Sequence, residues 1–152
     1  MFRHDDASSD TEMRDLLADA RRIAVVGLSY KAWRASNQIA RFLLECGYDV
    51  VPVYPRGDEV LGLRIYRTVA EIPGRVDLVD VFRRSEALPE VVEDALAAGT
   101  PALWFQLGCV SERAASTARQ AGVRVVMDRC IQVEHSRLLG VGWSVPGADG
   151  RR

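Results

Sequence analysis

The stretch Arg22-Ile23-Ala24-Val25-Val26-Gly27-Leu28-Ser29 decides the fold of this chain. Its apolar residues stand at consecutive positions, which is typical of a strand that is buried on both faces of a sheet. Gly27 follows directly, and a glycine at this place lets the chain turn tightly. The segment 36–47 comes next and has the length and the end residues of a helix. The sequence therefore predicts a strand, a turn and a helix.

The same pattern continues along the chain. Further apolar runs that predict buried strands lie at residues 49–53, 76–82, 102–106 and 124–127. The segments 36–47, 85–99 and 111–122 each begin with a serine that can cap a helix and end with a glycine that can take a left-handed conformation. Thr68 and Glu71 form a capping box for a shorter segment. A first helix runs through Met13, Leu16 and Leu17, with Asp10 or Thr11 as its cap.

This alternation predicts one α/β domain. Strands joined by helices of 10 to 15 residues form a parallel sheet with right-handed crossovers. We expect a Rossmann-like doubly wound parallel sheet of about five strands with helices on both faces. The domain is expected to span residues 11–143, because residues 1–10 and 144–152 lack periodicity and predict loose tails at both ends.

Composition excludes several classes of function. A formal net charge of -1 argues against a general nucleic-acid binder. No apolar run reaches the roughly 20 residues that span a bilayer, and the polar, acidic start is unlike a signal or transit peptide, so a cytoplasmic protein without membrane contact is expected. The cysteines lack metal-binding spacing. Apolar faces near Leu16 or Leu138 leave a homodimer open, since core packing explains these residues equally well.

The turns that leave the strands are the places to look for a ligand, because open parallel sheets bind ligands beyond their carboxyl ends. In the first turn, Gly27 lets a phosphate approach the backbone, while Ser29 and Ser36 can donate hydrogen bonds to it. Lys31 and Arg34 can add charge, or can be ordinary solvated residues. The turn lacks both G-x-G-x-x-G and the phosphate-binding loop of NTPases.

The second turn argues against a plain NAD enzyme. NAD binding favours an Asp or Glu at the end of the second strand, and this chain has Tyr54, Pro55 and Arg56 there. An aromatic ring and a cation suit an adenine and a ribose phosphate. Coenzyme A carries a 3′-phosphate and NADP a 2′-phosphate; Arg56 suits either, or is simply solvated.

Five sequence blocks at the strand ends carry a resemblance to a known family. They are Gly27-Leu28-Ser29, Tyr54-Pro55, Asp80-Val81-Phe82-Arg83, Trp104-Phe105-Gln106-Leu107-Gly108 and Met127-Asp128-Arg129-Cys130. Across residues 13–140 the chain resembles the small stand-alone CoA-binding proteins, whose fold is similar to the CoA-binding domain of the succinyl-CoA synthetase alpha subunit. The chain departs from that family's pattern at Tyr30, often a proline, and at Tyr54, usually an asparagine, which puts an exact copy of the adenine contacts in doubt.

The resemblance implies that coenzyme A lies across the strand ends. The pyrophosphate would be held by the first turn, the adenosine would be bordered by Tyr54 and Pro55, and the pantetheine arm or the phosphates would be flanked by Phe82, Arg83 and Gln106. The full set of expected cofactor-binding residues is Gly27, Leu28, Ser29, Tyr30, Lys31, Arg34, Ser36, Tyr54, Pro55, Arg56, Phe82, Arg83, Gln106 and Gly108.

Catalysis by the chain itself is not expected. The synthetase uses a phosphorylated histidine in a second domain, and here His4 falls in the expected tail while His135 is expected to be structural, on a terminal helix. Cys109 and Cys130 fall near strand ends, where buried, inert thiols are favoured over a thiol that reacts with CoA. Asp80 is expected to cap a turn or to pair with Arg83. The favoured function is CoA or acyl-CoA binding; an NADP- or CoA-dependent enzyme or subunit, and an interaction protein with a vestigial cleft, stay open.

Overall fold

A five-stranded parallel sheet forms the centre of the protein. The computed structural model describes residues 9–148. The strands are β1 (Arg22–Val26), β2 (Asp49–Val53), β5 (Leu78–Val81), β6 (Ala102–Phe105) and β7 (Arg124–Met127). They lie in the order β2-β1-β5-β6-β7, and all neighbours are parallel. The expected Rossmann-like α/β fold is confirmed.

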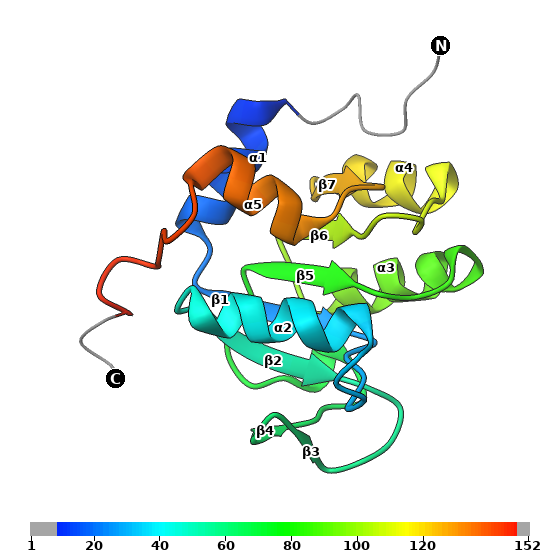
Figure 1. The fold of residues 1–152 in the computed structure, drawn as a ribbon. Helices are drawn as coiled ribbons and strands as arrows, with labels where there is room; N and C mark the ends of the chain where they lie inside the picture. The colour runs from blue at the N-terminus through cyan, green and yellow to red at the C-terminus, as the bar shows by residue number, and fades with distance from the viewer. Residues whose placement is uncertain (1–8, 149–152) are drawn as a thin grey trace.

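Helices cover both faces of this sheet (Figure 1). One face carries α1 (Asp10–Asp19), α2 (Ala35–Glu45) and α5 (Ile131–Leu139), and the other carries α3 (Leu88–Ala97) and α4 (Glu112–Gln120). Short 3₁₀ helices span Val69–Glu71 (η1) and Ser85–Ala87 (η2). The chain builds β2 on one side of β1 and β5 to β7 on the other, so the strand order reverses next to β1. In open α/β sheets this is where a crevice for ligands forms.

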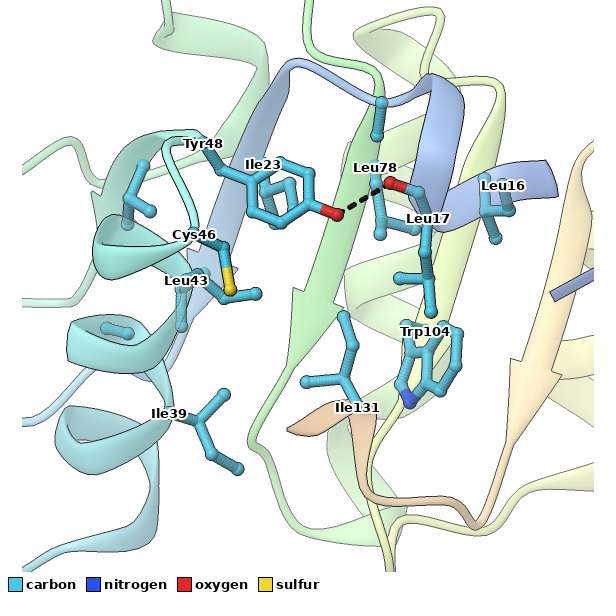
Figure 2. Close-up of a cluster of buried hydrophobic side chains, with 14 of the residues drawn as sticks. Leu16, Leu17, Ile23, Ile39, Leu43, Cys46, Tyr48, Leu78, Trp104 and Ile131 are labelled. Carbon is cyan, nitrogen blue, oxygen red and sulfur yellow. Dashed lines mark hydrogen bonds between the residues drawn. The ribbon is translucent and has the colours of Figure 1, made fainter. Parts of the chain in front are cut away.

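The core beneath α1, α2 and α5 contains a short chain of polar contacts. The Tyr48 hydroxyl donates a 2.6 Å hydrogen bond to the carbonyl of Leu17 (Figure 2), and Nε2 of His135 lies 3.0 Å from the same hydroxyl. Since the hydroxyl proton is directed at Leu17, His135 Nε2 is the donor of the second bond. His135 is 1% exposed. Its predicted structural role on a terminal helix is confirmed.

The helix ends confirm part of the capping prediction. All three terminal glycines have positive φ angles, namely Gly47, Gly99 and Gly122. Ser111 caps α4 by accepting a hydrogen bond from the amide of Ala114. Ser36 and Ser85 do not cap helices, because their hydroxyls accept hydrogen bonds from distant loop amides instead. Ser9, rather than Asp10 or Thr11, caps α1.

Two further features differ from expectation. An antiparallel hairpin of β3 (Glu59–Val60) and β4 (Leu63–Arg64) follows β2. The chain from 144 to 148 is not a loose tail, since Val145 is 1% exposed and its amide donates to the carbonyl of Cys46. Ser9 and Asp10 are not part of a loose tail either, since they cap and begin α1, and the remaining expected tail residues, 1–8 and 149–152, lie outside the described range. Within residues 9–148, no helix has both the length and the apolar character needed to cross a membrane.

Candidate functional site

A cavity of about 630 Å³ opens at the carboxyl ends of β1, β2 and β5. It lies where the strand order reverses, at the place that the sequence analysis selected. The residues that line it come from the turns after these three strands, from the start of α2, and from the segment after β4. They are Val26, Gly27, Ser29, Tyr30, Lys31, Arg34, Ala35, Ser36, Val53, Tyr54, Pro55, Arg56, Arg67, Phe82 and Arg83.

Gly27 brings the three strand ends together. Its amide donates a 2.8 Å hydrogen bond to the carbonyl of Val53 at the end of β2. On its other side, a Cβ atom at this position would collide with the carbonyl oxygen of Phe82 after β5. Its φ angle of +86° also lies in the region that favours glycine. The backbone of the first turn is therefore exposed to the cavity at close range.

The loop 28–34 is held in shape by the start of α2. The amide of Ser29 donates to Ser36 Oγ at 3.0 Å, and Asn37 Nδ2 donates to the carbonyl of Ser29 at 2.8 Å. No side chain caps the N-terminus of α2 at Arg34. The helix start lines the cavity, so its first amides and its partial positive charge are directed towards a ligand there.

Positive charge dominates the cavity lining. The five charged side chains among the lining residues are all cations, namely Lys31, Arg34, Arg56, Arg67 and Arg83. All five side chains are exposed. Carboxylates are absent from this lining, so nothing there opposes the binding of an anion. Such a cavity suits a ligand that carries several phosphates.

Arg67 is a lining residue that the sequence analysis missed. Its Nη1 donates to the carbonyl oxygens of Tyr54 and Gly57, at 3.3 and 2.9 Å, and so fixes the second turn. Arg67 reaches this place because Tyr66 pairs with the end of β2, at Val53. Residues 63 to 67 do not alternate regularly between apolar and polar side chains, so the local sequence carried no clear signal for this short extended segment.

The structure brings most of the predicted site residues together. Eleven of the fourteen line the cavity: Gly27, Ser29, Tyr30, Lys31, Arg34, Ser36, Tyr54, Pro55, Arg56, Phe82 and Arg83. Three do not. Leu28 is fully buried in the core, Gly108 donates its amide to Asp128 Oδ1, and Gln106 is 3% exposed.

Gln106 is committed to a buried network. Its Nε2 donates to Oδ1 of Asp80, and its Oε1 accepts from the amide of Ile131 at the start of α5. Asp80 does not pair with Arg83 as expected, because its side chain points into the interior and is fully buried. Burial raises the pKa of Asp80 to about 7, although the hydrogen bond from Gln106 opposes the shift. This network anchors α5 to the sheet.

The thiol of Cys109 is buried and hydrogen-bonded. Its Sγ lies 3.1 Å from the carbonyl oxygen of Arg83, and burial raises the pKa of the thiol. A raised pKa disfavours the thiolate, which is the reactive form. The three cysteines of the described chain are free thiols. Residues 9–148 contain no group of three His, Cys, Asp or Glu side chains placed to hold a metal ion.

Comparison with known proteins connects the fold and the cavity to a family. Residues 21–136 match the family described as the CoA binding domain. An uncharacterized protein of Bacillus subtilis, YneT, is 41% identical over 128 residues, which cover 84% of this chain and 95% of that protein. A solved structure of a hypothetical protein from Pyrococcus horikoshii is similar with a TM-score of 0.87 and 39% identity, covering 92% of this chain and 99% of that one.

Longer enzymes contain a similar region. The alpha subunit of an ADP-forming acetate–CoA ligase from Pyrococcus furiosus is 26% identical over 128 residues, which cover 74% of this chain but only 28% of the ligase subunit. The chain therefore corresponds to a small part of that subunit. The family match spans most of the chain, and the B. subtilis relative matches over nearly its whole length. This chain belongs to the CoA-binding domain family.

Proposed function

We propose that this protein binds coenzyme A or an acyl-CoA in the cavity at the carboxyl ends of β1, β2 and β5, without catalysis of its own. The observation that carries the proposal is the lining of five cations without an opposing carboxylate, beside an uncapped helix start. Coenzyme A presents a pyrophosphate and a 3′-phosphate, and each needs cations or amide groups to replace its water.

The cavity offers separate places for these groups. The pyrophosphate would lie against Gly27, Ser29 and the first amides of α2, where backbone and dipole both favour an anion. The 3′-phosphate would face Arg56, and the adenine would lie against the Tyr54 ring of the second turn. Phe82 is half-buried at the end of β5 and offers an apolar surface to the pantetheine arm.

The wider setting follows from the same observations. Three free thiols fit a reducing compartment, which supports a cytoplasmic protein. A role as the CoA-binding subunit of a larger enzyme is the second candidate, because a similar region occurs within the ligase alpha subunit from P. furiosus. Turnover of an acyl-CoA by this chain together with a separate protein would favour that candidate.

Thermal unfolding with a panel of ligands tests the proposal. The panel is CoA, acetyl-CoA, dephospho-CoA, NAD, NADP and ATP. A ligand at a hundredfold excess over its Kd stabilises the folded state by about 2.7 kcal/mol, which raises the Tm of a domain this size by several degrees. We expect a rise with CoA or acetyl-CoA. A rise in Tm with NADP alone would show that the ligand is NADP and not CoA. No rise with any ligand would contradict the proposal.

A charge reversal locates the binding. Arg34→Glu places a carboxylate in the cavity and is expected to abolish the rise in Tm with CoA. Arg14→Glu makes the same charge change on the exposed side of α1, away from the cavity lining, and should preserve it. Equal losses in both variants would show that net charge, rather than this cavity, governs binding.

A further inference from the structure

Side chains of the first and second turns meet at one end of the cavity. The rings of Tyr30 and Tyr54 pack edge to face, with centroids 5.9 Å apart and an angle of 70° between their planes. The guanidinium carbon of Arg56 lies 5.9 Å from the centroid of the Tyr54 ring. All three residues line the cavity. We refer to Tyr30, Tyr54 and Arg56 as the cross-turn cluster.

Tyr30 and Arg56 of the cross-turn cluster lie at the surface, while Tyr54 is half-buried and packs against the core beneath α1, α2 and α5. Tyr30 is 51% exposed, and Arg56 is exposed as well. Tyr30 is among the few large apolar side chains of the described residues that remain so open to solvent. An exposed aromatic group that lines a cavity and contacts a cation is better placed to contact a ligand than to stabilise the fold.

Arg56 is restrained from two sides. The Tyr54 ring lies beneath its guanidinium and is itself held by the Tyr30 ring, and the neighbouring Tyr30 hydroxyl, as an acceptor, raises the pKa of Arg56. An exposed arginine ordinarily loses much side-chain freedom when it binds an anion, and restraint before binding reduces that loss. The loop that carries Tyr30 is itself held by Ser36 and Asn37 of α2.

We propose that Tyr30 is a specificity-determining residue of this site: it positions Arg56 to contact a phosphate on the adenosine ribose, so that the cavity selects a nucleotide that carries this phosphate over one that lacks it. The inference rests on the proposed function and adds how the site distinguishes a nucleotide with a ribose phosphate from one without it. Tyr30 acts through Arg56 and is therefore a positioning residue.

The ring contact also limits where the base can lie. Because the Tyr30 and Tyr54 rings already touch, a purine cannot be inserted between them without breaking the cluster. The base therefore packs against an outer surface of the cluster. This arrangement leaves Arg56 in place and directs it towards the ribose.

Calorimetric titration of two ligands tests this inference. The Kd is measured for CoA and for dephospho-CoA, which lacks only the 3′-phosphate. In Tyr30→Phe the ring contact remains and the hydroxyl is lost. We expect the ratio of the dephospho-CoA Kd to the CoA Kd to fall roughly three- to tenfold, which is the size of effect expected when one ordinary polar contact at an exposed site is lost. The Kd for dephospho-CoA itself should change by less than about twofold. Tyr30→Ala, which also removes the ring, should lower the ratio at least as far.

Tyr66→Phe is the matched control. Tyr66 also lies under an arginine, with the guanidinium carbon of Arg64 5.1 Å from its ring centroid, but neither residue lines the cavity. In Tyr66→Phe the ratio of the dephospho-CoA Kd to the CoA Kd should equal that of the wild type. An unchanged ratio in Tyr30→Phe, or a wild type that binds both ligands equally, would overturn the role of Tyr30 while CoA binding stands. Absence of CoA binding in the wild type would overturn the proposed function, and this inference with it.

Discussion

The carbonyl oxygen of Phe82 lies so close to Gly27 that a single added methyl group would overlap it. Phe82 also donates its amide to the carbonyl of Val26, so the ends of β1 and β5 are tied together at the point where the strand order reverses. The cavity begins at this contact. The position therefore determines both the fold and the shape of the site.

Gly27→Ala should destabilise the protein by about 2–4 kcal/mol, as the sum of a left-handed conformation and an overpacked contact. The free energy of unfolding in denaturant measures this. Gly122 has nearly the same φ angle, +87°, but open space around its missing Cβ. Gly122→Ala should therefore cost only about 1–2 kcal/mol. Equal losses at the two positions would contradict the close contact.

Asp80 should make stability fall as the pH rises. Burial raises its pKa to about 7 in the folded protein, against 3.8 for the ordinary side chain. Well below pH 3.8 the group is protonated in both states and costs nothing; the penalty grows as the pH rises towards 7 and then levels off. Asp80→Asn removes the charge, so its stability relative to the wild type should increase by about 3 kcal/mol between pH 4 and pH 8.

Asp77 provides the contrast for that experiment. Burial acts to raise its pKa, but hydrogen bonds from Arg75 and from the amides of Arg22 and Arg21 together lower it. Asp77→Asn should therefore lose stability relative to the wild type as the pH rises, the opposite sign to Asp80→Asn. Denaturant unfolding at several pH values measures both, and slopes of the same sign would contradict this assignment.

His135 should make the protein sensitive to acid. Burial lowers its pKa from 6.5 to about 4, so between these values the unfolded state takes up a proton that the folded state does not. As the pH falls from 7 to 4, the free energy of unfolding of the wild type should decrease by about 2–3 kcal/mol relative to that of His135→Phe. The Tyr48 hydroxyl keeps its bond to Leu17 in this variant (Figure 2). A difference that stays constant over this range would rule out the buried neutral imidazole.

The segment after α5 should contribute to stability. Val145 is 1% exposed and packs beside Gly47, whereas Val141, four residues earlier, is 94% exposed. Val145→Ala should cost about 1–3 kcal/mol and Val141→Ala less than about 0.5 kcal/mol. Thermal unfolding of the two variants measures the difference. Indistinguishable Tm values would mean that residues 144–148 add nothing to the core.

Much of this fold could be predicted because each central strand is a short run of consecutive apolar residues. Glycines such as Gly47 and Gly99 then ended the helices where expected. The hairpin of β3 and β4 has two residues in each strand, too few for a period to show. The segment 144–148 was missed because only Val145 and Ala148 are buried, and a spacing of three residues in so short a segment carries no pattern.

The site was predictable as far as it follows from the strand ends. Gly27, Tyr54 and Arg83 come directly after strands or close to them, and so reach one cavity. Gln106 also follows a strand, but its side chain turns inward to Asp80, and only the three-dimensional structure shows this. Arg67 depends on the pairing of a remote segment with β2, which local sequence does not reveal.

The most direct test of CoA binding at the strand ends is a titration of isotope-labelled protein with CoA, followed by the NMR shifts of its backbone amides. Binding in this cavity predicts saturable shifts concentrated at residues 27–36, 54–56 and 82–83. The amides of β7, the edge strand at the opposite end of the sheet from β2, and of α4, which packs against β7, should stay unchanged. Shifts centred there, or none at millimolar CoA, would contradict the account.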